Sequence, residues 1–310
     1  MNPKLFNPDY LLSLCQKYDL RPSKKYGQNF LLSPEVIEEM IAAAEVGKKD
    51  TVVEVGPGFG VLTFALAEKA GKVLAFEIEK RLEEYWKKSA PGNLEIIWGN
   101  VLKEFEKVVI ARTRLGGDEA IFLIGDCRVP KGARDDSYKV VANLPYQITS
   151  NVIRTFLESE NPPGVMVLMA QKEVAERICA RPGEMSLLSV AVQYYASAEI
   201  IAQVPRHLFW PEPAVDSAVI RIIPHASVIA RSPDLVGTTK QSPGDRHGLR
   251  PRDDMFFKIV KAGFAQKRKK LSKNIPQAKS FFKELGIGEQ ARAQELSLEQ
   301  WKELVIHLSV

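Results

Sequence analysis

The sequence predicts an α/β protein in which a largely parallel sheet is followed by a small all-helical region. Residues 34–160 alternate short apolar runs with amphipathic stretches, which is the pattern that βαβ units produce. From Asp253 to the end the chain is helix-like throughout. The length of 310 residues fits about two domains, because a single core rarely grows beyond this size.

The strands are predicted from short apolar runs, which fit the buried strands of a parallel sheet. These runs cover residues 51–55, 72–78, 94–98, 138–144 and 165–170. Two later stretches, 189–204 and 217–223, are also strand-like. We expect them to form an antiparallel edge of the same sheet.

The helices are predicted from the amphipathic stretches between these runs. They cover residues 34–46, 60–70, 79–89 and 148–159. Ser33 and Pro34 supply a capping residue and a proline at the first helical position of the first helix. Another helix is expected after Lys172, and the C-terminal region should contain a basic helix and then helices over 278–287 and 297–308.

Two segments interrupt this pattern and divide the chain. Residues 107–137 are rich in Gly, Arg and Asp, and we interpret them as an insertion. Residues 226–252 combine Pro, Gly, Ser and charged residues, which is typical of a flexible linker. We therefore predict one domain over 1–225, built on the sheet, and a helical domain over 253–310.

The composition, 45% hydrophobic and 26% charged, is that of a globular protein without a membrane-spanning apolar run. The N-terminal residues lack the apolar core of a secretory signal, so we expect a cytoplasmic protein. Cys15, Cys127 and Cys179 lie far apart in the sequence, which supports neither disulfides nor a zinc site. The four histidines are scattered, and we expect no metal.

Positive charge is concentrated near the C-terminus, although the net charge of the whole chain is only +5. Nine cationic residues and no acidic one lie between Met255 and Lys283, which leaves 34 basic against 38 acidic residues elsewhere. This cluster indicates a polyanionic partner, and a solvated lysine-rich helix face is the alternative. The candidate contacts to such a partner are Lys267, Arg268, Lys269, Lys270 and Lys273.

A glycine-rich turn, EVGPGFG, follows the first predicted strand and precedes a predicted helix. Gly56, Gly58 and Gly60 allow the backbone to approach a ligand closely, although a tight structural turn would need the same residues. Glu77 ends the second predicted strand, 17 residues after Gly60, where its carboxylate can accept hydrogen bonds from a ribose. The turn and the acid together predict a nucleoside-bearing cofactor, either a dinucleotide or S-adenosylmethionine.

The sequence Asn143-Leu144-Pro145-Tyr146 ends the fourth predicted strand, at the sheet edge where open α/β folds bind ligands. Asn and Pro also terminate strands, so a simple turn is the alternative. The Asn143 side-chain carbonyl and a main-chain carbonyl of Leu144 or Pro145 can accept both N–H bonds of an adenine amine. These acceptors favour the positive charge that develops as the amine attacks a methyl sulfonium. Tyr146 can stack on the extruded base.

Motifs along almost the whole chain resemble those of one enzyme family. They are KKYGQNFLLSP (24–34), EVGPGFGVLT (54–63), FEIEKRL (76–82), ANLPYQITS (142–150), FWPEPAVDSAVIRI (209–222) and FAQKRKKLSKNI (264–275). In this order they resemble the ribosomal RNA adenine N6-dimethyltransferases, specifically the bacterial small-subunit type. The resemblance implies a Rossmann-like S-adenosylmethionine-dependent methyltransferase sheet. It also implies dimethylation of two adjacent adenosines in small-subunit ribosomal RNA and a role in ribosome biogenesis.

The resemblance also implies roles for individual residues. Asn29 and Leu31 would cover the cofactor, Gly56 would contact its methionine portion and Glu77 would hold its ribose. The expected cofactor-binding set is Gln28, Asn29, Leu31, Gly56, Gly58, Glu77, Ile78, Asn100, Val101 and Asn143. The expected catalytic set is Asn143, Leu144, Pro145 and Tyr146. The basic cluster would bind ribosomal RNA within a pre-ribosomal particle, and we expect a monomer without a metal.

The chain departs from the family's pattern after the third predicted strand. The family usually has Gly-Asp-x-Leu there, with the Asp accepting from the adenine amine of the cofactor, whereas this chain has Gly99-Asn100-Val101-Leu102. An Asn carbonyl can accept the same bond without charge assistance. A Gly125-Asp126 pair follows later, but it lies inside the insertion and lacks the preceding strand, so we favour Asn100. The gap from Asn100 to Asn143 and the linker at 226–252 are both longer than usual.

Other functions explain the sequence less well. Large-subunit adenine methyltransferases that confer antibiotic resistance share the cofactor motifs, but the motif around Asn143 and residues 211–219 resemble the small-subunit type. A non-catalytic RNA-binding assembly factor would not need an intact Glu77 and Asn143. A nicotinamide oxidoreductase would leave the Asn-Leu-Pro-Tyr motif and the basic region unexplained.

Overall fold

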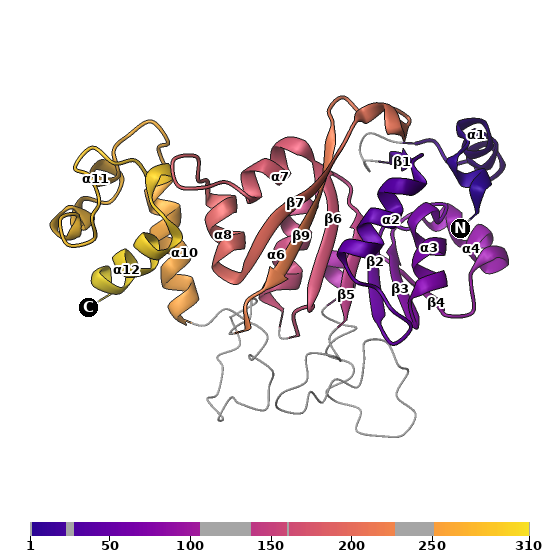
Figure 1. Cartoon of the computed structure of the whole chain (residues 1–310), viewed down its shortest axis with the longest axis horizontal. Coiled ribbons are helices and arrows are strands. Elements are labelled where there is room, and N and C mark those ends of the chain that lie inside the picture. Colours follow the sequence, from indigo (N-terminus) through magenta and orange to yellow (C-terminus); the bar gives the residue numbers. More distant parts are fainter. Residues whose placement is uncertain (1, 23–27, 106–137, 160, 227–250, 310) are drawn as a thin grey trace, which may run out of the picture.

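The structure is a computed structural model that describes residues 2–22, 28–105, 138–159, 161–226 and 251–309. Its centre is a seven-stranded sheet with the order β4-β3-β2-β5-β6-β9-β7 (Figure 1). The strands are β2 (Thr51–Val55), β3 (Lys72–Glu77), β4 (Leu94–Trp98), β5 (Lys139–Asn143), β6 (Val165–Gln171), β7 (Ala196–Val204) and β9 (Ser217–Pro224). The first five in this order are parallel, and β9 pairs antiparallel with both β6 and β7. The predicted α/β fold and its antiparallel edge are confirmed.

Successive residues of the strands point to opposite faces of the sheet, and the apolar side chains on each face form a separate core. Helices therefore cover both faces. One core joins Val52, Val73 and Val141 to α1 (Pro8–Lys17), α2 (Pro34–Ala43), α3 (Val61–Lys69) and α4 (Glu83–Ser89). The opposite core joins Val53 and Leu74 to α6 (Thr149–Glu158), α7 (Lys172–Ile178) and α8 (Leu187–Tyr195). Short 3-10 helices, η1 (Pro3–Phe6), η3 (Lys80–Leu82) and η4 (Arg206–Leu208), complete this part of the chain.

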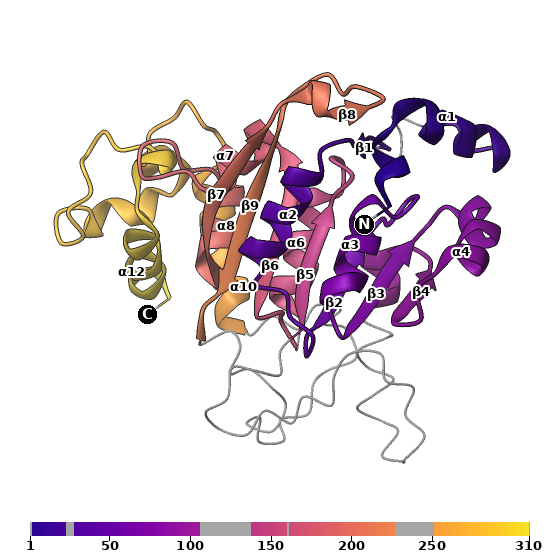
Figure 2. The ribbon, with the colours of Figure 1, turned by 45° about the vertical axis from the view of Figure 1, so that its right-hand side comes forward.

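A second sheet of two short strands lies near the carboxyl ends of the parallel strands (Figure 2). It pairs β1 (Phe30–Leu31) with β8 (Phe209–Trp210), and Phe30 stacks on Trp210 with ring centroids 6.2 Å apart. The N-terminal segment is thereby joined to the connection between β7 and β9.

The prediction that residues 189–195 belong to a strand is wrong, because they form most of α8. Ser186 and Ser189 make a capping box in which each side chain accepts a hydrogen bond from the other residue's N–H. The apolar and aromatic residues suggested a strand, but Val190 and Tyr195 instead pack in a core. The strand begins only at Ala196, where β7 starts.

The prediction of a basic helix carrying Lys267 and the cations that follow it is also wrong. Helix α10 (Pro251–Gly263) ends before Lys267, and the next helix, α11 (Leu271–Asn274), has only four residues. The Asn274 side-chain amide donates to the carbonyls of Gly263 and Gln266, which holds the intervening chain in turns. The predicted helix over 278–287 is replaced by a 3-10 helix, η6 (Pro276–Phe281), and further turns. Helix α12 (Leu298–Leu308) is confirmed.

The C-terminal helices pack on the sheet domain through α8. Tyr194 stacks on Phe256 with ring centroids 4.3 Å apart, and its hydroxyl donates to Asp253 Oδ1 at 2.8 Å. Val260 and Trp301 belong to the same apolar cluster as the sheet residues. Helix α10 starts at Pro251, inside the segment predicted as a linker. The domain division at 225 and 253 remains a prediction, and residues 107–137 and most of 226–252 lie outside the described residues.

Candidate active site

A cavity of about 310 Å³ opens at the carboxyl ends of β2, β3 and β5. Its lining combines an N-terminal segment, the glycine turn, the loop after β3 and the start of the Asn-Leu-Pro-Tyr motif. The structure brings together here all the residues that the sequence suggests for cofactor binding: Gln28, Asn29, Leu31, Gly56, Gly58, Glu77, Ile78, Asn100, Val101 and Asn143. Their individual roles remain predictions.

The glycine turn is shaped by two different requirements. Gly58 has a φ of +54°, and a Cβ at this position would lie 3.2 Å from the Phe30 ring, which closes over the turn. Gly60 has a φ of +89°, and a Cβ there would lie within 2.8 Å of the Phe64 and Trp86 rings. The absence of a Cβ at Gly58 therefore lets the Phe30 ring of the N-terminal segment pack over the turn. The absence of a Cβ at Gly60 makes room for the Phe64 and Trp86 rings at the start of α3.

Glu77 is buried in the cavity wall and fixed by main-chain hydrogen bonds. Its Oε2 accepts from the N–H of Gly58 at 3.1 Å, and its Oε1 accepts from the N–H of Glu79 at 2.7 Å. Burial raises the pKa of Glu77, and these hydrogen bonds oppose the rise. The carboxylate that the sequence assigns to the ribose is thus already positioned against the glycine turn.

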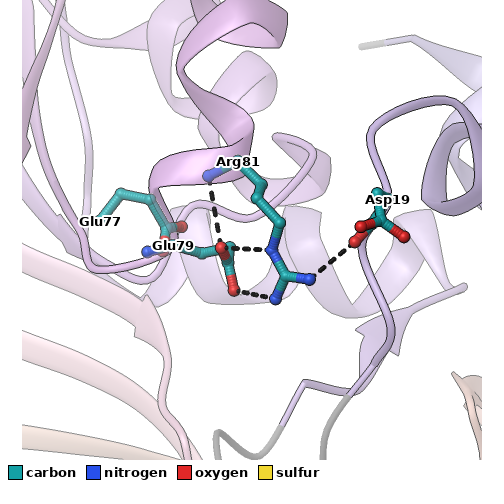
Figure 3. A network of polar contacts seen from close by, with 4 residues as sticks. All are labelled: Asp19, Glu77, Glu79 and Arg81. Atoms are coloured by element: carbon teal, nitrogen blue, oxygen red, sulfur yellow. Dashed lines mark hydrogen bonds and ion pairs between the residues drawn. The ribbon is translucent and has the colours of Figure 1, made fainter.

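Arg81 links the loop after β3 to the end of α1 (Figure 3). Its Nε and Nη2 each donate to one carboxylate oxygen of Glu79 at 2.8 Å, and its Nη1 donates to the Asp19 carbonyl at 2.7 Å. The hydrogen bond from Arg81 lowers the pKa of Glu79. Leu20, directly after Asp19, lines the cavity, so this network holds the chain that follows α1 against the loop after β3.

Glu54 is a cavity residue that the sequence analysis did not single out. It is fully buried, and its Oε2 has no hydrogen-bond partner among the described residues. Burial raises the pKa of Glu54 to about 8, and the charge of Glu77 also raises it. The sequence feature that could have identified Glu54 is an acidic residue inside the apolar run TVVEV, two residues before the first glycine of the turn.

The Asn-Leu-Pro-Tyr motif is divided between the cavity and the rest of the sheet edge. Asn143 and Pro145 line the cavity, whereas Leu144 is buried beneath it and donates from its N–H to the Met169 carbonyl at 3.1 Å. The Asn143 Nδ2 donates to the Asn29 carbonyl at 3.2 Å. Tyr146 is half-buried outside the cavity lining, with its hydroxyl 2.8 Å from that of Ser217.

Asn100 lines the cavity, but its side chain already makes one local contact. Its Oδ1 accepts from the Leu102 N–H at 3.0 Å, as a capping residue does at the start of a helical turn. The oxygen retains a second lone pair for a ligand. The alternative residue, Asp126, lies outside the described residues.

The five cationic residues proposed for RNA contact are exposed and lie away from the cavity, on the turns after α10 and at α11. They are Lys267, Arg268, Lys269, Lys270 and Lys273. In Figures 1 and 2 the turns after α10 lie on the upper side of the view, as β1 and β8 do, but at the opposite end of the long axis. Within the described ranges, no three His, Cys, Asp or Glu residues gather as a metal site would require. None of the described helices has the length and apolar character to cross a membrane.

The fold and the cavity define a Rossmann-like methyltransferase. The family model for ribosomal RNA adenine dimethylase matches residues 20–235, and the chain belongs to this family. It is 34% identical to the ribosomal RNA small subunit methyltransferase A of Dehalococcoides mccartyi, covering 94% of this chain and 90% of the relative. The protein of that name from Clostridioides difficile is also 34% identical, with coverage of 94% and 92%.

Solved structures show the same fold. The 23S rRNA methyltransferase ErmE aligns with a TM-score of 0.61 and 24% identity, covering 90% of this chain and 99% of its own. A dimethyladenosine transferase from Plasmodium falciparum aligns with a TM-score of 0.62 and 21% identity, covering 90% and 97%. At these identities the likeness supports the fold.

Proposed function

We propose that this protein transfers methyl groups from S-adenosylmethionine to the N6 amines of two adjacent adenosines in small-subunit ribosomal RNA. The observation that carries the proposal is the contact between Asn143 and Asn29 at the cavity. Because the Asn143 Nδ2 donates one N–H to a main-chain carbonyl, the orientation of the amide is set, and its Oδ1 would accept from the ligand. An acceptor in this place suits an amine, which presents N–H groups.

The cavity residues fit S-adenosylmethionine, which supplies an electrophilic methyl group when it is bound. Glu54 holds a proton in the free protein, and the ammonium of the methionine portion beside its unpartnered oxygen would lower its pKa and favour a charge-assisted hydrogen bond. Gly56 and Gly58 leave space for a close ligand, Glu77 would hold the ribose and Asn100 would accept from the adenine amine. Asn29 and Leu31 would cover the cofactor from the N-terminal side.

The target adenine would be held by the Asn-Leu-Pro-Tyr motif. The Pro145 carbonyl already accepts from the Ile148 N–H at 3.1 Å and from the Thr149 hydroxyl at 3.5 Å, so both of its lone pairs are engaged. This favours the Leu144 carbonyl as the second acceptor beside Asn143 Oδ1. Two acceptors stabilise the positive charge that grows on nitrogen during attack. A sulfonium is a good leaving group, so the reaction needs no strong general base. Tyr146 would stack on the extruded base.

The small-subunit substrate is supported by the relatives. Proteins named ribosomal RNA small subunit methyltransferase A share 34% identity with nearly the whole chain, whereas ErmE shares 24%. A non-catalytic assembly factor is disfavoured by the intact cavity. We further propose that the enzyme acts as a metal-free monomer in the cytoplasm, on RNA within a pre-ribosomal particle. The exposed cluster around Lys267 would bind RNA phosphates.

The test is methyl transfer from labelled S-adenosylmethionine to small-subunit particles that lack the modification, with the methylated positions mapped. Dimethylation of two adjacent adenosines is the expected result. Asn143→Ala should reduce turnover far more than cofactor affinity, because its contact acts mainly in the transition state. Methylation of large-subunit RNA instead, or cofactor binding without any transfer, would overturn the proposal.

A further inference from the structure

The hydroxyls of Tyr146 and Ser217 lie 2.8 Å apart, and either atom can be the donor of the hydrogen bond between them. Tyr146 lies in the short connection between β5 and α6, and Ser217 is the first residue of β9. The contact therefore joins the last residue of the Asn-Leu-Pro-Tyr motif to the antiparallel part of the sheet.

Ser217 is a fully buried hydroxyl at the start of an apolar strand. It lies opposite Gln171 of β6 and Val204 of β7, and the residues that follow it, 218–220, are buried and apolar. A buried hydroxyl costs free energy unless it is hydrogen-bonded. An alanine could occupy this position without such a cost, so packing alone does not explain the hydroxyl, whereas its contact with Tyr146 does.

We propose that Ser217 is a positioning residue that holds the Tyr146 ring in the orientation required to stack on the target adenine. This inference rests on the proposed function, in which Tyr146 contacts the base. The main chain fixes one end of the tyrosine side chain and Ser217 fixes the other, so the long axis of the ring is set. A phenolic hydrogen bond also lies near the ring plane, which restrains rotation about that axis.

Such restraint matters because stacking and methyl transfer both depend on geometry. Aromatic partners prefer offset arrangements within a narrow range of separations. A displacement of about 1 Å can reduce a rate by roughly 100-fold when the reacting atoms lose alignment. The ordinary pKa of Tyr146, 10.0, already keeps its hydroxyl protonated at neutral pH, and burial raises the pKa further.

The test compares Ser217→Ala, Tyr146→Phe and the double variant in the full-length protein. Turnover on small-subunit particles and cofactor affinity are measured for each. A second readout uses RNA that carries 2-aminopurine in place of the target adenosine, whose fluorescence reports base stacking. We expect each variant to lose roughly 10- to 100-fold in turnover and most of the fluorescence change, with cofactor affinity retained. The double variant should be no worse than either single one.

Ser189→Ala is the matched control, because Ser189 is also fully buried and hydrogen-bonded but belongs to the capping box of α8. It should lower thermal stability and leave turnover and fluorescence unchanged. Normal turnover and fluorescence in both Ser217→Ala and Tyr146→Phe would overturn the inference. If Ser217→Ala fails to fold, Tyr146→Phe decides, because it removes the same hydrogen bond without altering the strand.

Tyr146→Ala separates this inference from the proposed function. A large loss of turnover with Tyr146→Ala, together with normal Ser217→Ala and Tyr146→Phe, contradicts only the positioning role of Ser217. Normal turnover and fluorescence with Tyr146→Ala contradicts the stacking role itself.

Discussion

The carboxamide of Asn143 is oriented by the main chain of Asn29, whose carbonyl accepts its Nδ2 at 3.2 Å. Asn29 belongs to the N-terminal segment that lines the cavity, so one short contact joins the covering segment to the residue proposed to bind the target amine. The orientation of Asn143 therefore depends on the placement of this segment against β5.

Asn143→Asp should make turnover depend on pH. A protonated aspartate can still donate to the Asn29 carbonyl and accept with its other oxygen. An ionised aspartate has no proton to donate, so its carboxylate and the Asn29 carbonyl repel each other and the orientation is lost. Above the pKa of the new carboxyl, activity should fall about tenfold per pH unit. Turnover measured between about pH 5 and 8, with Asn143→Ala as the reference, checks this. Activity that rises with pH would show that the carboxylate accepts freely and that Asn29 does not set the orientation.

Glu77→Ala should weaken S-adenosylmethionine binding by about 1.5–3 kcal/mol, as expected for the loss of a charged hydrogen bond. Part of this loss of affinity will come from loosening of the glycine turn and of the loop after β3, because Glu77 also accepts hydrogen bonds from the N–H groups of Gly58 and Glu79. Calorimetry gives the affinity. Thermal unfolding without ligand measures how much stability is lost with the two main-chain hydrogen bonds alone. Glu95→Ala, which removes a partly exposed acid from β4, is the control. Equal affinities for Glu77→Ala and the native protein would remove Glu77 from the site.

Glu54→Gln should change how stability depends on pH. Burial raises the Glu54 pKa to about 8 from the usual value near 4.5, so the folded state holds a proton that the unfolded state releases between these pH values. The free energy of unfolding should therefore decrease as pH rises through this window, by about 1.4 kcal/mol per pH unit from this group. Glu54→Gln removes that slope.

Denaturation of the unliganded protein and of Glu54→Gln across this pH range provides the measurement. The stability difference should increasingly favour the glutamine variant as pH rises and level off above about 8. Parallel curves for the two proteins would show that Glu54 ionises normally when folded.

Neutralising Lys267, Arg268 and Lys269 should weaken RNA binding and flatten its salt dependence. If each contacts a phosphate, the slope of log affinity against log salt should fall in magnitude by about 0.7–0.9 per residue. Cofactor affinity should not change, because these side chains are exposed and do not line the cavity. A gel-shift or fluorescence titration at several salt concentrations gives the slope.

The control for this variant is neutralisation of Lys48, Lys49 and Lys69. They are also exposed, but they flank the amino ends of β2 and β3, at the sheet edge opposite the cavity. An unchanged salt slope in the Lys267 variant would leave Lys24 and Lys25, near the N-terminus, as the better candidates for RNA contact.

The parallel strands and their order along the chain were predictable because each is a short apolar run between helices, as β2 and β6 illustrate. That residues 187–195 form the helix α8 could not be predicted, because the valines and tyrosines suit a strand and only the capping box at Ser186 marks a helix start. The turns around Lys267 depend on the Asn274 side chain, a contact across the chain that periodicity cannot reveal. Glu54 was overlooked because the importance of an acid inside a strand depends on its burial beside Glu77.

The packing of the last helices on α8 has a consequence for how the chain is made. Tyr194 and Tyr195 form ring contacts with Phe256 and Phe257, and the cluster is completed by Trp301, near the end of the sequence. During synthesis from the N-terminus, the aromatic face of α8 leaves the ribosome well before the residues that cover it. Until α10 and α12 have been translated, this face lacks the residues that cover it in the folded protein, and exposed apolar surface of this kind favours aggregation.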